Sequence, residues 1–478
     1  MDSDDFRKNA HLLVEWIADY YDNIESYPVK SKVKPKEIFN KLESSPSQNS
    51  EQFEQIMSDF ESIIMPGITH WQSPHFQAFF PANTSFPSLL GEMLTSALGA
   101  QCMLWETSPA AAELEEMIMS WLAQMINLPD GFQGVIQDTA STATLCSILT
   151  AREKFTDFAI NSNGFSGNEN FRIYCSSEAH SSIEKAAKIA GLGKNCLRKV
   201  AVKSDFSMDT DDLEKRISED IEAGFKPLCV VGALGTTGST AVDPIEAIGM
   251  ICKRHNIWFH VDAAYSGSAL ILPEMQYLGK GLELADTFVF NPHKWLFTNF
   301  DCSAYFVKDK SALIRTFEIM PEYLKTGVDS EVNNYRDWGI QLGRRFRALK
   351  LWFVIRSFGV TVLQEKLRLH LNLTKQFLDK IKTYPEFEIL APVNFNVICF
   401  RFKPDGITDE NILEKLNKTL LNELNNSGKI YLSHTKLNGK YTIRIVFGQT
   451  NLEQRHTDEA FDLIIDYTEK LNRLIFPV

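Results

Sequence analysis

A lysine that could act as a nucleophile directly follows a short apolar segment. The run Thr287–Asn291 leads into Pro292, His293, Lys294 and Trp295. Such neighbours argue against a solvated surface charge, although a loop lysine with a packed stem is the plain alternative. A partly desolvated lysine loses basicity and becomes an amine nucleophile, the group that forms Schiff bases with carbonyl compounds.

A carboxylate ends another apolar run earlier in the chain. Ile257–Val261 is followed by Asp262. This carboxylate could ligate a metal, cap a structural turn or pair with a cationic ring nitrogen. We expect no metal site, because no further histidine or carboxylate stands at a convincing spacing.

Small hydroxyl residues mark the start of a predicted helix. The segment Gly134–Gln137 is followed by Asp138 and then by Thr139, Ala140 and Ser141. Free N–H groups, the helix dipole and hydroxyl donors converge at such a start and can bind an anion. Serine and threonine are also ordinary N-caps, so this signal is weak when taken alone.

A histidine precedes another predicted helix. Arg172–Ser176 leads to His180, and the spacing from Ser181 to Glu184 predicts a capping box. His180 is either a satisfied loop residue or an imidazole stacked on an aromatic cofactor.

Together these groups meet the needs of pyridoxal 5′-phosphate (PLP). The lysine forms the imine, a carboxylate keeps the pyridine nitrogen protonated, a helix start holds the phosphate, and an imidazole covers one face. The protonated ring is an electron sink, which is why the carboxylate partner matters.

The elements that must position these groups form an alternating pattern. From residue 84 to 355, short apolar runs alternate with polar-faced helices, which indicates a mostly parallel sheet covered by helices. Before it, residues 1–83 contain an amphipathic helix in Asn9–Ile24 that cannot bury its apolar stripe alone. After it, residues 356–478 predict a smaller α+β unit. The predicted strands are Gly134–Gln137, Arg172–Ser176, Leu228–Leu234, Ile257–Val261, Thr287–Asn291, Ser303–Val307, Phe387–Leu390, Val397–Phe402 and Tyr441–Phe447, with a helix over Thr361–Thr383.

Composition excludes several classes of protein. The net charge of −12 over 478 residues argues against a nucleic-acid partner, which needs clustered Lys and Arg. The eight cysteines form no CxxC pair, which favours a reducing compartment. The charged N-terminus is not a signal peptide, and no long apolar run could span a membrane. We therefore expect a cytoplasmic protein.

The sequence strongly resembles the group II PLP-dependent decarboxylases of the aromatic-L-amino-acid decarboxylase type. The likeness runs from Phe6 to the end of the chain and implies a fold-type-I homodimer. Its active sites would lie at the subunit interface, and the N-terminal residues 1–83 would form an arm that wraps the partner subunit. The motifs that carry it are Met65-Pro66-Gly67-Ile68-Thr69-His70-Trp71, Ser108-Pro109-Ala110, His180-Ser181-Ser182, His260-Val261-Asp262-Ala263-Ala264-Tyr265, Asn291-Pro292-His293-Lys294-Trp295 and Leu342-Gly343-Arg344-Arg345-Phe346-Arg347.

The resemblance assigns roles to the cofactor residues. Lys294 would form the Schiff base, Asp262 would bind the pyridine nitrogen, and His180 would stack on the ring above Ala264. The remaining residues would hold the phosphate (Thr139, Ala140, Ser141, Asn291), lie beside His180 (Thr237) and support the cofactor or the substrate carboxylate (His293).

The family also ties a loop tyrosine to protonation of the substrate Cα, and Tyr323 matches it. Relatives with phenylalanine there tend towards aldehyde products, so Tyr323 favours an amine. Asp138 stands where many relatives have glycine, and we expect its side chain to point away from the phosphate.

The substrate pocket is assigned only by matching positions of this sequence to those of the family. It would comprise Trp71, Phe79, Phe80, Pro81, Ala82 and Gly343, with Gln101 and Met103 from the partner chain. An aromatic wall suits a flat side chain, Gly343 leaves room for a bulky ring, and an acidic substrate would need a dedicated arginine. Phe79 and Ala82 replace the usual Tyr and Thr, so two hydroxyls that could bond a catechol are absent. Phenylalanine, tyrosine, tryptophan, DOPA and 5-hydroxytryptophan all remain possible substrates.

Three other functions remain open. The chain could be an aromatic aldehyde synthase on the same fold, a decarboxylase for histidine or an acidic amino acid, or a non-catalytic homologue. Peroxide formation, a substrate panel and visible cofactor absorbance would separate these.

Overall fold

The computed structural model describes residues 1–319 and 331–475. The chain folds as two units, each with its own packed interior. Unit 1 comprises residues 1–81, 373–390 and 398–478, and unit 2 comprises residues 82–372 and 391–397. The three-part division at residues 83 and 355 remains a prediction.

Unit 2 is built on a seven-stranded sheet with the strand order β1-β7-β6-β5-β4-β2-β3. All neighbouring strands pair in parallel except β7, which runs antiparallel to both β1 and β6. The prediction of a mostly parallel α/β sheet is therefore confirmed. The strands are β1 (Gln133–Gln137), β2 (Phe171–Ser176), β3 (Leu197–Val200), β4 (Lys226–Ala233), β5 (Trp258–Asp262), β6 (Thr287–Phe290) and β7 (Ser303–Val307).

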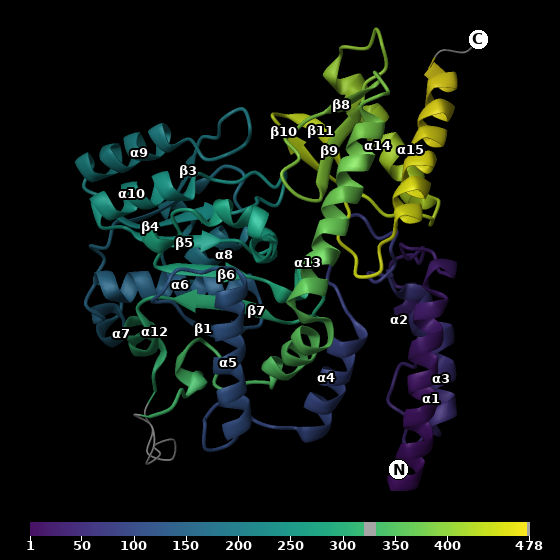
Figure 1. The fold of residues 1–478 in the computed structure, drawn as a ribbon, viewed down its shortest axis with the longest axis horizontal. Coiled ribbons are helices and arrows are strands. Elements are labelled where there is room, and N and C mark those ends of the chain that lie inside the picture. The colour runs from purple at the N-terminus through teal and green to yellow at the C-terminus, as the bar shows by residue number, and fades with distance from the viewer. Residues whose placement is uncertain (320–330, 476–478) are drawn as a thin grey trace. The chain divides into compact units, whose positions relative to one another are not determined.

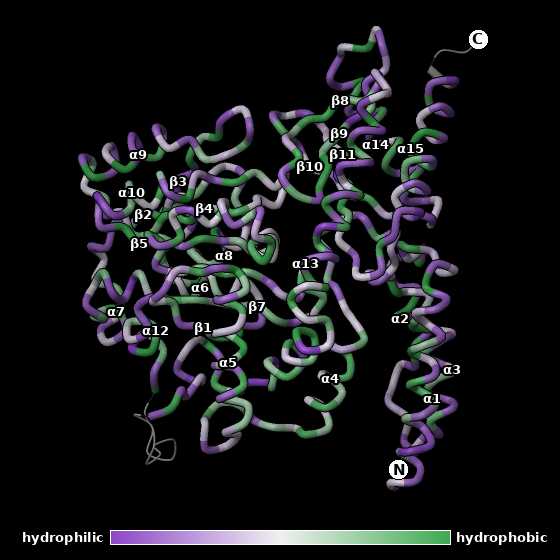
Figure 2. The backbone as a smooth tube through the Cα atoms, in the orientation of Figure 1, coloured by the Kyte–Doolittle hydropathy of each residue, from purple (hydrophilic) through white to green (hydrophobic). Residues whose placement is uncertain are grey.

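Helices surround this sheet (Figure 1). Helix α6 packs across the central strands, and α9 and α10 pack against β4. Helix α9 is mostly hydrophilic (Figure 2), in keeping with its position at the surface, where it buries only three residues. The helices of this unit are α4 (Phe86–Leu98), α5 (Pro109–Met125), α6 (Ala140–Phe155), α7 (Ala159–Asn163), α8 (Ser182–Ile189), α9 (Thr210–Glu222), α10 (Ile245–His255), α11 (Pro292–Trp295) and α12 (Lys310–Phe317).

Unit 1 combines N-terminal helices with a four-stranded sheet of order β10-β11-β9-β8. Helix α1 has no buried residue along its 20 positions. Helix α13 (Arg347–Ile381) begins in unit 2 and ends in unit 1, and Gly359, with φ of 68°, interrupts it. The other elements are α1 (Ser3–Asp22), α2 (Glu37–Lys41), α3 (Phe53–Asp59), β8 (Phe387–Ile389), β9 (Val397–Phe402), α14 (Glu410–Asn426), β10 (Ser433–Leu437), β11 (Lys440–Val446) and α15 (Gln454–Ile475).

Two further observations concern the cysteines and the apolar character of the helices. All eight cysteines of the chain lie in the described part, and all are buried and free of disulfides. No helix among the described residues combines the length and apolar character that a membrane span requires.

Candidate active site

The predicted cofactor residues gather at one edge of the sheet in unit 2. Strands β1, β2, β4, β5 and β6 run in the same direction, so their carboxyl ends share that edge. Asp138, His180, Thr237, Asp262 and Lys294 each follow or end one of these five strands. Open α/β sheets bind ligands at this edge.

Lys294 is held by its backbone and its neighbours. It lies in the single turn α11, and the Asn83 side-chain amide donates to its carbonyl oxygen at 2.6 Å. The next residue, Trp295, is fully buried and stacks on Tyr265 with 5.1 Å between ring centroids. Burial lowers the pKa of the Lys294 amine. A lowered pKa increases the share of the neutral amine, which is the nucleophilic form.

The carboxylate of Asp262 acts on two neighbouring titratable groups, Lys294 and His180. It raises the pKa of Lys294 and that of His180, in each case opposing the effect of desolvation. One of its oxygens accepts a hydrogen bond from the Ala264 backbone N–H at 3.0 Å, which fixes the carboxylate at the end of β5. Both Asp262 and Ala264 are half-buried, so they can face a ligand at the sheet edge.

His180 is exposed, and its ring is oriented through one nitrogen. The Ser182 N–H donates to Nδ1 at 3.2 Å, and the Ser182 hydroxyl lies 2.9 Å from the same atom. A neutral ring that accepts at Nδ1 carries its proton on Nε2. Partial desolvation lowers the pKa of His180 further than Asp262 raises it, which favours the neutral form. The predicted capping box is wrong, because Ser181 makes no cap bond and His180 bonds the Ser182 N–H instead.

The predicted phosphate segment forms the start of α6. Thr139 is the N-cap, and its hydroxyl accepts from the Thr142 N–H at 3.4 Å. Ser141 is exposed in the first turn of the helix. The Asp138 side chain was expected to point away from the phosphate. Its carboxylate instead accepts from the N–H of Thr139, one of the residues assigned to the phosphate, at 2.6 Å.

His293 and Asn291 are buried beside this segment. The Cys302 N–H donates to Nδ1 of His293 at 2.9 Å. Burial, reinforced by Lys294 and Lys350, lowers the pKa of His293 to about 3. Its ring is therefore neutral at physiological pH, with the proton on Nε2.

Thr237 lies in the turn that follows β4, and its side chain is exposed. The turn depends on Gly235, which has φ of 94°. A Cβ on this glycine would lie 2.0 Å from the Ser266 hydroxyl, so no larger residue fits without displacing that side chain.

Some predicted pocket residues gather within unit 2. Gln101 and Gly343 line a cavity of about 610 Å³. A Cβ on Gly343 would lie 3.2 Å from the Gln101 amide nitrogen. The two residues are therefore neighbours within one chain, whereas Gln101 was expected to reach Gly343 from the partner chain. Met103 lies in the same segment as Gln101, and Ala82 begins the unit.

The other predicted pocket residues belong to unit 1. Trp71 stacks on Phe76 at 4.2 Å and on Phe79 at 6.0 Å between ring centroids. Trp71 and Phe79 are both exposed, at 38% and 45%. Phe80 and Pro81 follow directly and end the first segment of that unit. Tyr323 lies outside the described residues.

Two site residues carried no signal in the sequence. Asn83 bonds the carbonyl of Lys294, but a lone asparagine in an irregular segment indicates nothing. The Ser303 hydroxyl donates to Asn291 Oδ1 at 2.7 Å and to the Asp138 carbonyl at 3.4 Å. The antiparallel pairing of Gln137 with Ser303 makes this bridge possible, and that register is not readable from the chain.

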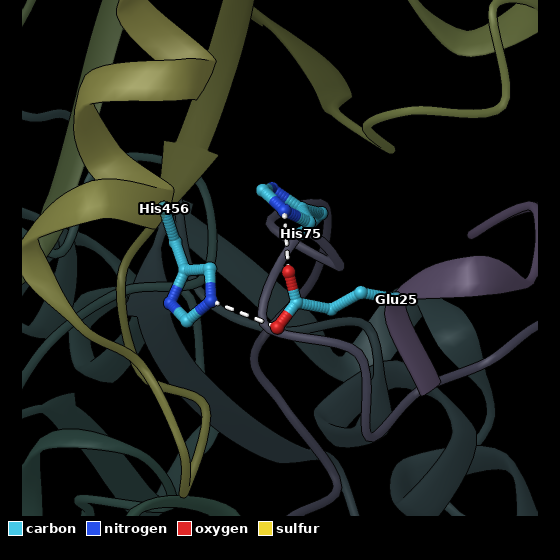
Figure 3. A group of neighbouring side chains, drawn as sticks. All are labelled: Glu25, His75 and His456. Carbon is cyan, nitrogen blue, oxygen red and sulfur yellow. Dashed lines mark hydrogen bonds and ion pairs between the residues drawn. The ribbon is translucent and has the colours of Figure 1, made fainter. Parts of the chain in front are cut away.

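One group of metal-ligating side chains stands out among the described residues, and it lies in unit 1 (Figure 3). Single ligand atoms of Glu25, His75 and His456 lie within 4.8 Å of one another. However, the Glu453 N–H donates to Nδ1 of His456 at 2.9 Å, which places the proton of a neutral ring on Nε2. That Nε2 lies 3.2 Å from Glu25 and cannot ligate a metal while protonated. Arg455 also donates to both oxygens of Glu25, so the group is a hydrogen-bonded ion-pair network.

The chain is similar to known enzymes over nearly its whole length. It is 40% identical to tyrosine decarboxylase 3 of Petroselinum crispum, covering 98% of this chain and 93% of that one. It is 42% identical to phenylacetaldehyde synthase of Arabidopsis thaliana, covering 97% and 96%. The crystal structure of Oryza sativa TDC with PLP and tryptamine superimposes with a TM-score of 0.96 at 36% identity, covering 98% and 99%. Residues 35–403 match the pyridoxal-dependent decarboxylase conserved domain, and the chain therefore belongs to this family of PLP-dependent carboxy-lyases.

Proposed function

We propose that this chain converts an aromatic L-amino acid into the corresponding amine and CO2, with PLP as its cofactor. The observation that carries the proposal is the meeting of Lys294, Asp262 and His180 at the carboxyl edge of the sheet, within reach of one another's charge. Relatives that cover nearly the whole chain include a tyrosine decarboxylase, which supports both the reaction and the substrate class.

The residues of the sheet edge fit PLP. A desolvated amine, a carboxylate and a helix start with hydroxyl side chains match the aldehyde, the pyridine nitrogen and the phosphate of this cofactor. Lys294 would bind the aldehyde carbon, Asp262 would keep the ring nitrogen protonated, and Thr139, Ala140, Ser141 and Asn291 would hold the phosphate. The neutral ring of His180 would stack on the cofactor ring, and Ala264 and Thr237 would also line it.

When bound, PLP accepts the electron pair that remains on the substrate Cα after CO2 leaves. The protein must therefore hold the Cα–carboxylate bond perpendicular to the cofactor ring. We assign the binding of that carboxylate to the neutral His293 side chain. Tyr323 then donates a proton to Cα, which makes an amine the product.

The charges around Gln101 and Gly343 favour an aromatic over an acidic substrate. Three arginines line the same cavity, but each has a carboxylate partner: Arg344 pairs with Glu115, Arg345 with Glu92 and Arg347 with Asp301. Recognition of an acidic side chain would require breaking one of these pairs, which is costly for the buried Arg344. The residues assigned to the substrate are Ala82, Gln101, Met103 and Gly343 in unit 2, and Trp71, Phe79, Phe80 and Pro81 in unit 1.

We further propose that the enzyme is a cytoplasmic homodimer with shared active sites. Helix α1 buries none of its residues, and α4 is hydrophobic along most of its length (Figure 2). Both need a partner surface. The eight buried free thiols suit a reducing compartment.

A product assay tests the function. The purified protein is incubated with PLP and with phenylalanine, tyrosine, tryptophan, DOPA, 5-hydroxytryptophan, histidine and glutamate in turn, and amine, aldehyde and hydrogen peroxide are quantified. We expect amine and CO2 from aromatic substrates with little peroxide. Aldehyde with stoichiometric peroxide would instead make the chain an aldehyde synthase, the activity of the relative from Arabidopsis thaliana. Turnover of histidine or glutamate alone would overturn the substrate class.

A further inference from the structure

A carboxylate occupies the hydrogen-bond donors of the segment that is assigned to the phosphate. Asp138 Oδ1 accepts from the Thr139 N–H at 2.6 Å and from the Thr139 hydroxyl at 3.3 Å. Its other oxygen, Oδ2, accepts from the Gln341 side-chain amide at 3.0 Å. Both oxygens are therefore engaged, and one of them takes the donors of the N-cap residue.

These donors would otherwise be available to an anion. The first N–H groups of a helix have no acceptor within the helix, and in α6 they belong to Ala140 and Ser141, beside Thr139. A phosphate bound here gains from the N–H groups, the hydroxyls and the helix dipole together. A carboxylate on Thr139 removes two donors and adds a negative charge next to that phosphate.

The Asp138 charge reaches other groups of unit 2. Burial acts to lower the pKa of His293 and that of Arg347, and the Asp138 carboxylate opposes both effects, so both side chains lie within its field. The backbone is also fixed, because the Ser303 hydroxyl bonds both the Asp138 carbonyl and Asn291 Oδ1. Asp138 is thus held beside two of the groups assigned to the phosphate, Thr139 and Asn291.

We propose that Asp138 competes with the cofactor phosphate for the Thr139 donors and thereby lowers the affinity for PLP. The inference rests on the proposed cofactor role of this segment. Phosphate must displace the carboxylate from Thr139 when the cofactor binds, and Gln341 offers the displaced carboxylate a remaining partner. The enzyme would then exchange its cofactor more readily than one without this charge.

The test compares Asp138→Asn with the unchanged protein. Asparagine keeps the size of the side chain and removes its charge. We expect the dissociation constant for PLP, measured by cofactor absorbance on the dialysed protein, to fall by about tenfold, as for removal of one like charge several ångströms away. The ratio should shrink at high salt because the repulsion is screened. The affinity for pyridoxal, which lacks the phosphate, should not change.

Two further variants keep the test decisive. Asp138→Gly removes the carboxylate entirely and should also tighten PLP binding, should the asparagine disturb the turn. Asp130→Asn makes the same charge change before the other end of β1 and should leave the affinity for PLP unchanged. Without cofactor, Asp138→Asn should melt at a lower temperature than the unchanged protein, and added PLP should raise its melting temperature by more.

Unchanged or weaker PLP binding in both Asp138 variants would overturn the proposal. So would an equal gain for pyridoxal, because the effect would then not concern the phosphate. If the unchanged protein bound no PLP at all, the cofactor assignment itself would fail, and this outcome is visible before any variant is compared.

Discussion

Burial and the carboxylate of Asp262 have opposite effects on the pKa of the Lys294 amine. Desolvation favours the neutral amine, and the nearby carboxylate favours the charged one; the net effect is a lowered pKa. A lowered pKa favours the neutral amine, which is the form that attacks a carbonyl. Asn83 fixes the backbone carbonyl of Lys294, so the side chain starts from a defined position.

Lys294→Ala removes the amine, and we expect turnover to fall by about 10³-fold or more together with the visible absorbance of the bound cofactor. The secondary structure, measured by circular dichroism, should be preserved. Lys280→Ala, which changes an exposed lysine in the same unit, should keep both activity and absorbance. Steady-state turnover by the Lys294 variant at the original rate would refute the assignment.

Tyr323→Phe removes the proposed proton donor, so we expect the product to shift from amine towards aldehyde, with oxygen consumed and hydrogen peroxide and ammonia released. Amine and aldehyde are quantified from the same reaction. Tyr277→Phe removes the hydroxyl of a tyrosine that is 71% exposed and should leave the ratio as it was. An unaltered product ratio in the Tyr323 variant would mean that another group protonates Cα.

At the scale of elements, the sequence predicted those strands well whose residues are almost all buried. Strands β4, β5 and β6 are almost fully buried, so they appear as apolar runs and their ends located Asp262 and Lys294 correctly. Strands β3 and β10 were missed because both lie at a sheet edge and expose part of their residues. The predicted direction of the Asp138 side chain was also wrong. A single side-chain rotation decides it, and the periodicity of the sequence carries no information on that rotation.

The network of Glu25 joins helix α15 to two segments of unit 1 that are distant in sequence. Glu25 binds Arg455 through both oxygens and also contacts His456 and His75 (Figure 3). The hydrogen bond from Arg455, aided by His456, lowers the pKa of Glu25 to about 2. The pKa is lower in the folded than in the unfolded chain, so the carboxylate stabilises the fold above pH 4.5. That stability is lost as the pH falls towards 2.

Glu25→Gln should therefore lower the melting temperature at pH 7, and the difference from the unchanged protein should shrink as the pH falls below 4.5. Because the Glu25 side chain is 35% exposed, the loss should be about 1 kcal/mol or less. Thermal unfolding between pH 7.5 and 3.5 measures it. Glu43→Gln, at an exposed position of the same unit, should change little at any pH. A difference that grew on acidification would contradict the sign of the shift.

At the scale of the whole molecule, α4 carries an apolar stripe that its own unit leaves uncovered. Phe86, Leu90, Leu94 and Leu98 recur every four residues and are between 47% and 64% exposed. The buried side of the helix, at Ser88, Gly91 and Thr95, is packed closely, because a Cβ on Gly91 would lie 2.6 Å from the Cα of Lys350. Contiguous apolar stripes of this kind mark interfaces between subunits, whereas isolated exposed apolar residues do not.

Replacing Leu90 and Leu94 together by glutamate places two charges in the proposed interface, where they would be desolvated without partners, and should separate the dimer. In sedimentation, the unchanged protein should run at twice the 54.3 kDa of one chain and the variant at one chain mass. Because the proposal places each active site between subunits, the variant should lose activity in proportion to its monomer fraction. Ile221→Glu with Met250→Glu, at isolated exposed positions on α9 and α10, should leave a fully active dimer. A fully active monomer would show that one chain suffices for catalysis, and an intact dimer would remove α4 from the interface.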